Sequence, residues 1–569
     1  MPPKTPRKPV TASAARPRSK KLNGHSGPLK LLPKVIAMLS LAALSSSVSQ
    51  LNLSPVYGVI PSYLYHQKAI TATAFIAFMG RSALNIYLPK NVEKYIPVLA
   101  FWIPNIQHVL FKFSGQLGPT YGPILTEALT FVPLLGLVFY TVSSMLDSLD
   151  LSELNPVIAD MLPPVGSYFM FSIVEKTISS SISQWMGSTD LLTRSGLNFL
   201  IAAGFAALSP SLLLLLAAPA LYHTIAFNPH QFPDRTIPTL NSALQPHNFT
   251  LLARHESLTG YVSVLESSSS HFRVLRCDHS LLGGEWLVTP QRQQHGQRVP
   301  ESIYQVFTML EGVRLLETGD NRPESEKSAL VIGLGVGTAP KALIERGINT
   351  TVVELDPIVH EYAMSYFGLP ANHTAAIEDA VPFVERTSAK TPGAFDVIIH
   401  DVFTGGAEPA SLFTLEFLER LKALLSEKGA IAINYAGDLA LPSTRLVLNT
   451  IYTAFPNCRL FRDSPPNPAV PTDFINMVLY CVKNDEGKGK EAVRFRKPTE
   501  QDFGKSLAKR QHLVPKVELE IDFVFDPDEK KDLLKKGNTH ELERHHADSA
   551  RSHWKIMRTV LPDAVWENW

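Results

Sequence analysis

Six long apolar stretches in the first 224 residues constrain the fold of this 569-residue chain more than any other feature. They fall at 35–60, 70–88, 95–113, 119–145, 162–182 and 196–221. A helix needs about 20 apolar residues to cross about 30 Å of hydrocarbon, and most of these stretches reach that length. The sequence therefore predicts a multi-pass α-helical membrane domain over residues 35–224, with five or six helices. Glu175 and Lys176 lie inside 162–182, so an interfacial position is the alternative for that stretch.

Residues 1–34 precede these stretches and contain nine Lys or Arg residues and no acidic residue. Such a segment is typical of a disordered basic tail. A cleaved signal peptide is the alternative reading of 35–60, but the long basic region and the apolar stretches that follow favour a retained helix. The positive-inside rule places the tail in the cytosol. An even number of spans would return the globular half to the cytosol, which we expect, whereas an odd number would expose its sequons at Asn248, Asn349 and Asn372 across the membrane.

The composition after Tyr222 becomes mixed and charged, which predicts a globular half. Residues 260–266 and 271–278 alternate apolar and polar side chains around a serine tract and predict a β-hairpin, with a further strand at 283–288. We assign this hairpin subdomain to residues 250–300. The chain has only Cys277, Cys458 and Cys481, so we expect no disulfide framework.

From residue 328 onward, short apolar segments alternate with amphipathic helical ones. The apolar segments are ALVIGLG, TTVVELD, HTAAIED, FDVIIHD and AIAINYA. This alternation predicts a doubly wound parallel sheet over residues 301–483. In such sheets, ligands bind at the carboxyl ends of the strands, near the point where the strand order reverses.

Three glycines, Gly333, Gly335 and Gly337, follow the first of these strands, where the backbone must pass close to a ligand. The spacing is not the dinucleotide fingerprint G-x-G-x-x-G, because Thr338 stands where the third glycine is required. The phosphate-binding G-x-x-x-x-G-K-[ST] motif is absent as well. A purely structural tight turn is the alternative interpretation of the glycines.

Acidic residues at the ends of the next three strands favour a nucleoside site. Glu354 ends the second strand and is suited to accept hydrogen bonds from both hydroxyls of a ribose. Asp379 ends the third strand, where it can meet an adenine amino group, and Asp401 ends the fourth. Packing alone does not account for acidic side chains at three strand ends around one glycine loop.

These motifs, with SIYQVF at 302–307, resemble the spermidine synthase-like branch of the class I S-adenosylmethionine-dependent transferases over about residues 250–482. The resemblance implies an α/β Rossmann-like class I methyltransferase fold with a small N-terminal β-hairpin subdomain. It also implies that the glycines, Glu354 and Asp379 hold the nucleoside and that Asp401 is the catalytic base. Tyr304 and Gln305 match the residues that flank the family's polyamine channel.

The sequence departs from the aminopropyltransferases of that branch at three acidic positions. Val336 replaces the Asp of G-G-G-D-G, Thr404 replaces the second Asp of Asp-x-x-Asp-Pro, and Val306 replaces the Glu of Tyr-x-Glu. A polyamine is a chain of ammonium groups, so these losses remove most of its electrostatic recognition. We therefore expect methyl transfer from S-adenosylmethionine to a small-molecule, lipid or membrane-protein acceptor.

Two other functions remain open from the sequence. One is aminopropyl transfer in polyamine biosynthesis, with decarboxylated S-adenosylmethionine as the donor. The other is a non-catalytic nucleoside-binding scaffold or transporter-like protein. Arg81, Glu127 and the Glu175–Lys176 pair lie within the apolar stretches, where they are costly in lipid and would line a cavity or pair with one another.

The charged C-terminal extension, residues 484–569, adds no further predicted site. HELERHH at 540–546 predicts a charged surface helix rather than a metal site. Trp554, Trp566 and Trp569 predict an amphipathic helix that packs on the globular domain. The net charge is +1, and no basic face outside the tail indicates nucleic-acid binding.

Overall fold

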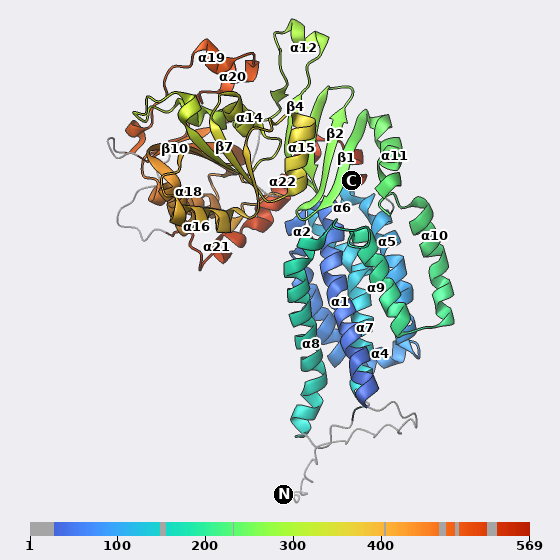
Figure 1. Ribbon diagram of the computed structural model, residues 1–569. Coiled ribbons are helices and arrows are strands. Elements are labelled where there is room, and N and C mark those ends of the chain that lie inside the picture. Colours follow the sequence, from blue (N-terminus) through green and yellow to red (C-terminus); the bar gives the residue numbers. More distant parts are fainter. Residues whose placement is uncertain are drawn as a thin grey trace, which may run out of the picture.

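The computed structural model describes residues 28–147, 149, 155–231, 233–402, 405–465, 474–483, 489–520 and 532–569. A helical bundle forms its N-terminal part, and two β-sheets with their covering helices form the rest (Figure 1). Most of the expected basic tail lies outside the described residues, which begin at residue 28. Thr404 lies outside them as well.

The bundle is built from apolar helices that pack around a core of residues from several of them. Its helices are α1 (Pro28–Tyr57), α2 (Val59–Tyr63), α3 (His66–Met79), α4 (Arg81–Tyr87), α5 (Ile96–Phe111), α6 (Ser114–Leu129), α7 (Phe131–Leu146), α8 (Pro156–Ser181), α9 (Arg194–Leu208) and α10 (Ala218–Phe227). Within the described residues, three helical segments have the length and composition to cross a membrane: Leu31–Tyr57, Ser114–Leu146 and Val157–Trp185.

The other expected spans form shorter helices. The stretch 70–88 is divided at Gly80 between α3 and α4, and 95–113 corresponds to the 16-residue α5. The stretch 196–221, expected as one span, ends its first helix at Leu208 and continues through the 3-10 turn Leu212–Ala217 into α10. Pro210 explains this break, because proline has no N–H to continue the helical hydrogen bonds.

Several of the ionisable residues in the bundle are paired, as expected from the cost of burying a charge. His66 Nδ1 contacts Glu127 Oε1, and Ser46 Oγ bridges His66 Nε2 at 2.7 Å and Glu175 Oε1 at 3.2 Å. Arg81 is paired with Asp147. Polar contacts therefore join α1, α3, α6 and α8 inside an otherwise apolar bundle.

The predicted hairpin belongs to a sheet with the order β1-β2-β3-β4-β5. Its strands are β1 (Phe249–Ser257), β2 (Gly260–Ser267), β3 (Phe272–Cys277), β4 (Ser280–Trp286) and β5 (Glu301–Ser302). The pairing of β2 with β3 confirms the hairpin. Strand β1, which was not predicted from the sequence, packs beside helix α11 (Pro233–Leu244).

The larger sheet has the order β13-β11-β12-β10-β9-β6-β7-β8. Its parallel strands are β6 (Ser328–Ile332), β7 (Asn349–Glu354), β8 (Thr374–Ile377), β9 (Phe395–His400) and β10 (Leu425–Asp438), and β11 (Cys458–Arg462), β12 (Phe474–Val482) and β13 (Val517–Glu518) continue it antiparallel. The chain leaves β6 for β7 and β8 on one side and then crosses to β9 on the other. This confirms the Rossmann-like doubly wound prediction and places the switch point at the ends of β6 and β9.

Helices cover both faces of the larger sheet and bury its apolar strands. One face is covered by α13 (Gln305–Leu310), α14 (Thr338–Glu345) and α15 (Pro357–Phe367). The other is covered by α16 (Ala380–Lys390), α17 (Leu415–Leu424) and α18 (Pro442–Ala454). Two-sided burial explains why these strands read as continuous apolar runs.

The structure contains one disulfide that the sequence analysis did not predict. Cys458 and Cys481 face each other on β11 and β12 and are bonded, and Cys277 is free and buried. The two cysteines are 23 residues apart in the chain, so only the register of the strands brings them together.

The C-terminal extension runs back from the larger sheet to the bundle. It includes α19 (Glu500–Phe503), α20 (Leu507–His512), α21 (His540–Glu543), α22 (His546–Val560) and α23 (Asp563–Glu567). Figure 1 shows α22 between the bundle and the larger sheet. Trp554 donates its indole N–H to the carbonyl of Val56 at 3.0 Å, and Trp566 is fully buried. The extension therefore packs on the bundle as well as on the globular half.

Candidate functional site

The glycine loop after β6 is a tight backbone cradle. Gly333, Gly335 and Gly337 have φ values of +83°, +54° and +80°, which favour glycine. A Cβ atom on Gly333 would lie 2.0 Å from the carbonyl oxygen of Asp401, and one on Gly335 would lie 2.4 Å from that of Leu282. No side chain fits at either glycine without moving backbone, so both positions require glycine.

Glu354, at the end of β7, contacts this loop directly. Its Oε2 accepts the backbone N–H of Leu334 at 3.0 Å, and its Oε1 accepts that of Asp356 at 2.9 Å. Burial raises the pKa of Glu354 to about 7. The two backbone hydrogen bonds lower the pKa and only partly offset the effect of burial. Glu354 therefore holds the backbone of the glycine loop at Leu334, the residue after Gly333.

Asp401 follows β9 on the other side of β6. Its Oδ1 accepts a hydrogen bond from Asn434 Nδ2 at 2.7 Å. Burial raises the pKa of Asp401 to about 6, and the Asn434 contact opposes that rise. A carboxyl group with this pKa exchanges protons close to neutral pH, as a general base requires.

Asn434 is a residue that the sequence analysis missed. It lies within β10 and is 6% exposed, in a strand whose neighbours Ile433 and Tyr435 are buried core residues. An amide in such a strand is costly unless it has a partner, and its partner is Asp401. The signal in the sequence was a single polar residue in the AIAINYA strand.

The acidic residues predicted at the end of the third strand follow β8, which lies beyond β7 in the sheet. Asp379 is exposed and caps α16 by accepting the N–H of Val381 at 2.8 Å. Its neighbour Glu378 pairs with Arg386. Both lie at the same strand edge as Glu354, because β8 is parallel to β7 and Ile377 is aligned with Glu354.

Tyr304 and Gln305 differ in exposure although they are adjacent. The Tyr304 hydroxyl is buried with no hydrogen-bond partner among the described residues, and its ring lies edge-on to Phe307. Burial raises the pKa of Tyr304 to about 12, so it stays protonated. Gln305 is exposed at the start of α13.

The position that an acid occupies in aminopropyltransferases is filled by packing. Val336 is 3% exposed, and a Cβ atom on Gly283 of β4 would lie 2.8 Å from Val336 Cγ2. Val306 is also buried. These contacts leave apolar side chains in the core where a cationic substrate would need carboxylates.

Gly406 and Ala407, which follow β9, contact two distant parts of the chain that the sequence did not connect with the site. A Cβ atom on Gly406 would lie 2.7 Å from the Cβ of His553 in α22. Ala407 forms an apolar cluster with Ile60 of α2 and Ala550 of α22. The bundle and the C-terminal extension therefore both contact the chain segment that begins at Asp401.

The histidines of the C-terminal extension do not gather into a metal site in the part of the chain that the structure describes. His546 Nε2 lies 3.9 Å from Glu408 Oε2, and His540 lies beside Glu541 at the surface. His400, next to Asp401, points into the core against Phe413, and burial lowers its pKa to about 4.

Some known proteins match only part of this chain, and one matches almost its whole length. The spermine/spermidine synthase domain family matches residues 311–483. The N-terminal histidine N-methyltransferase of Emericella nidulans is 44% identical over 545 residues, which cover 94% of this chain and 96% of that protein. The polyamine aminopropyltransferase of Vibrio vulnificus is 36% identical over 116 residues, 20% of this chain and 38% of that protein.

Among solved structures, human methyltransferase-like protein 13 in complex with SAH is 21% identical and covers 39% of this chain and 96% of that one, with a TM-score of 0.28. The full-length similarity extends through the bundle, the sheets and the C-terminal extension. The chain is an S-adenosylmethionine-dependent methyltransferase, and it belongs to the family of the N-terminal histidine N-methyltransferase of Emericella nidulans, within the spermidine synthase-like branch.

Proposed function

We propose that this enzyme methylates a nitrogen of an N-terminal histidine in a polypeptide acceptor. The similarity to the Emericella nidulans enzyme over almost the whole of both chains supports this acceptor class. The observation that carries the proposal is the Asp401 carboxylate, held by Asn434 at 2.7 Å beside the glycine loop. We also propose the division into a helical domain (35–224), a hairpin subdomain (250–300), a transferase domain (301–483) and an extension (484–569).

The glycine loop and two carboxylates are our proposed donor site. S-adenosylmethionine supplies an electrophilic methyl group on a positively charged sulfur when it is bound. Gly333, Gly335 and Gly337 offer backbone without side chains, Glu354 would accept the ribose hydroxyls, and Asp379 would meet the adenine. The fit is supported by the Glu354 carboxylate, which already accepts the N–H of Leu334 in the loop.

The imidazole ring is our proposed nucleophile. An unperturbed histidine ring has a pKa of about 6.5, and an α-amine has a pKa of about 7.7–8.0. At neutral pH the ring is therefore deprotonated, with a free lone pair, more often than the α-amine is. Asp401 would accept the N–H of one ring nitrogen and thereby aim the lone pair of the other. Positive charge develops on the ring as its lone pair bonds to the methyl group and the methyl–sulfur bond breaks, and Asp401 would take the N–H proton as that charge forms. Tyr304 and Gln305 remain candidates for acceptor contacts.

The acceptor proposal is tested with three synthetic peptides that differ only at residue 1. Full-length enzyme and S-adenosylmethionine are incubated with a peptide that starts with histidine, one that starts with alanine and one that starts with acetylated histidine. We expect one added methyl group on the first peptide, placed on the ring by fragmentation mass spectrometry. The other two peptides should react at least about 10-fold more slowly, since about 1.4 kcal/mol of lost recognition is one decade.

Equal methylation of the acetylated peptide would contradict recognition of the chain terminus. Methylation of the alanine peptide on its amine as fast as the histidine peptide would contradict the ring as nucleophile. Putrescine with decarboxylated S-adenosylmethionine serves as the control for aminopropyl transfer, and turnover of that pair would favour the polyamine reaction instead.

We further propose that the helical bundle anchors the enzyme in a membrane. The three long apolar helical segments support this. Their arrangement also bears on sidedness: Lys34 near the start of α1 pairs with Glu93, whereas Ser54 near its end contacts Asp278 of the hairpin subdomain. Figure 1 places the start of α1 and the sheets at opposite ends of the bundle.

This arrangement leads us to revise the expectation that the globular half is cytosolic. If the basic start of α1 is cytosolic, the globular half lies across the membrane. The Cys458–Cys481 disulfide supports the same side, because disulfides persist in oxidising compartments. The sequon residues Asn248 and Asn372 are exposed on this half.

Glycosylation in a eukaryotic cell tests this topology. We expect the wild-type chain to carry N-glycans at Asn248 or Asn372, seen as a mass that endoglycosidase treatment removes. The double variant Asn248→Gln and Asn372→Gln should show a smaller mass change or none. A correctly folded wild-type chain without glycans at either residue would restore the cytosolic topology.

A further inference from the structure

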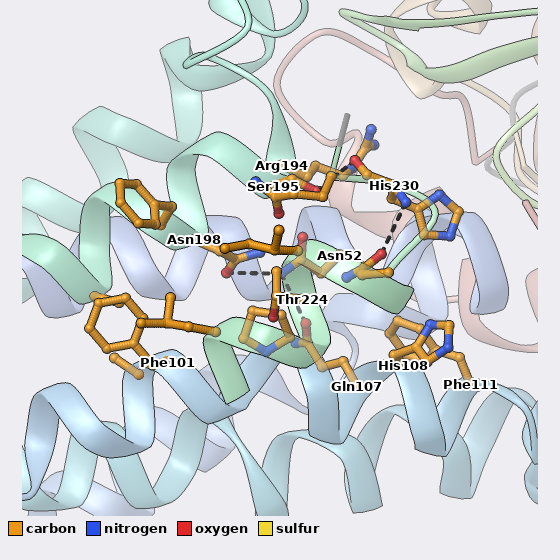
Figure 2. Close-up of a pocket in the computed structure, with 18 of the residues that line it drawn as sticks. Asn52, Phe101, Gln107, His108, Phe111, Arg194, Ser195, Asn198, Thr224 and His230 are labelled. Carbon is orange, nitrogen blue, oxygen red and sulfur yellow. Dashed lines mark hydrogen bonds between the residues drawn. The ribbon is translucent and has the colours of Figure 1, made fainter. Parts of the chain in front are cut away.

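A cavity of about 280 Å³ lies at the end of the bundle that contacts the hairpin subdomain, and it is separate from the proposed methyl-transfer site. Figure 2 shows residues of α5, α9 and α10 around it, together with Asn52 of α1. Residues 230, 261 and 569 close it on the side of the hairpin subdomain. Trp569 stacks on His230 with ring centroids 4.3 Å apart. None of the proposed donor or acceptor residues lines this cavity.

The cavity has an apolar mouth on an apolar surface. Phe199 and Ile225 line it and are 48% and 53% exposed. Other large apolar side chains in the segment 212–227, which includes α10, are exposed too: Leu212, Leu215, Leu216, Tyr222 and Phe227. A soluble ligand would have to cross this apolar surface, whereas a lipid tail enters from it at no cost in hydration.

The inner end of the cavity is polar and deeply buried. Asn52 donates to Gln107 Oε1 at 3.1 Å and to Asn198 Oδ1 at 3.3 Å. Gln107 is 3% exposed, and its Nε2 has no hydrogen-bond partner among the described residues. His108 Nδ1, on the next residue, is likewise unpartnered in that part of the chain. Buried polar atoms of this kind are normally satisfied, and the amide donor of Gln107 points to a ligand with an oxygen acceptor.

The charged groups near this end are already paired with protein. Arg194 donates to Glu256 Oε1 at 3.1 Å and lies 3.5 Å from Asp278 Oδ2, and its Nε donates to the carbonyl of Leu51. Its guanidinium group also stacks on Tyr261 at 4.2 Å. No unpaired charged side chain is therefore available in the described lining for an ionic headgroup, and an uncharged oxygen fits the amides better.

We propose that this cavity binds a membrane lipid, with an apolar tail or ring system between α5, α9 and α10 and an uncharged oxygen acceptor facing Gln107. The ester carbonyl of a glycerolipid and the hydroxyl of a sterol share this chemistry. The site is separate from the methyl-transfer site, and its occupant is bound without being modified.

Lipid retention by the full-length protein tests the proposal. The protein is reconstituted in phosphatidylcholine vesicles with or without cholesterol, returned to detergent, and analysed intact by native mass spectrometry. We expect one retained lipid per chain, whose mass distinguishes glycerolipid from sterol. The variant Ala202→Phe fills the cavity from α9, where Ala202 is 1% exposed. Its retention should fall at least about tenfold, because the tail's apolar contacts are lost.

The matched control is Ala207→Phe, on the same helix at an exposed position outside the cavity lining, which should retain lipid as the wild type does. Gln107→Leu removes the free donor and should lower retention about tenfold, as loss of one buried hydrogen bond predicts. S-adenosylmethionine affinity reports folding for all three, independently of the acceptor. No retained lipid in the wild type, or equal retention by Gln107→Leu and the wild type, would overturn the proposal.

Discussion

Asp401→Asn is expected to lower turnover by about 10²-fold or more, the typical contribution of a general base, while donor affinity changes far less. Asparagine keeps the shape of the side chain and one oxygen that can still face Asn434, which contacts the wild-type carboxylate at 2.7 Å. It cannot take a proton from the acceptor. Single-turnover rates with a saturating histidine peptide, and calorimetry with S-adenosylmethionine, separate the two effects.

The pH profile gives this prediction a second readout. Burial raises the pKa of Asp401 to about 6, so the carboxyl group is neutral below that pH and charged above it. Wild-type turnover should therefore fall as the pH drops through about 6, where the acceptor imidazole also becomes protonated. In the Asp401→Asn variant, turnover should fall with pH only as far as protonation of the acceptor imidazole causes it to. A variant that keeps wild-type turnover but binds the donor weakly would show that Asp401 is a donor ligand and not the base.

Much of the catalytic fold follows from local sequence signals. The parallel strands are buried on both faces, so they read as apolar runs, and the helices between them have apolar faces of helical period. All three glycines of the loop have positive φ, a conformation that other residues adopt at a cost. The backbone therefore requires glycine at these positions, and the glycines mark the loop in the sequence. Strand order then brought Glu354 and Asp401 to one edge on either side of β6.

Other parts of the site depend on contacts that sequence periodicity does not encode. Asn434 reaches Asp401 only because β10 lies beside β9, and α22 reaches Gly406 across about 150 residues of intervening chain. The disulfide likewise depends on the register of two antiparallel strands. Single polar residues and distant helices carry too little local signal to predict such pairings.

In the bundle, composition predicted apolar helices but not their lengths. Gly80 and Pro210 interrupt stretches that hydropathy alone reads as continuous. The buried Glu127 and Glu175 were recognised as costly, and their contacts with His66 and Ser46 required the packing of four helices. Hydropathy reports an average over a window, whereas helix ends are set by single residues.

The contacts between the bundle and the transferase domain argue for studying the enzyme as a whole. Trp554 binds the carbonyl of Val56, and Ala550 packs with Ile60 and with Ala407 near the site. A fragment without the bundle would expose this apolar cluster and leave the segment after Asp401 without one of its supports. Measurements of donor binding and turnover therefore belong on the full-length chain.

Glu354→Ala is expected to weaken donor binding by roughly ten-fold or more, because charge-assisted hydrogen bonds contribute about 1.5–3 kcal/mol each and about 1.4 kcal/mol is one decade. The substitution removes the proposed ribose contacts and also the acceptor for the N–H of Leu334, so the glycine loop loses a support. Glu361→Ala, an exposed carboxylate on α15, is the matched control and should leave affinity unchanged. Calorimetry with S-adenosylmethionine measures both. If Glu354→Ala binds the donor as tightly as Glu361→Ala, the nucleoside lies elsewhere on the strand edge, and the assignment of the glycine loop to the donor falls with it.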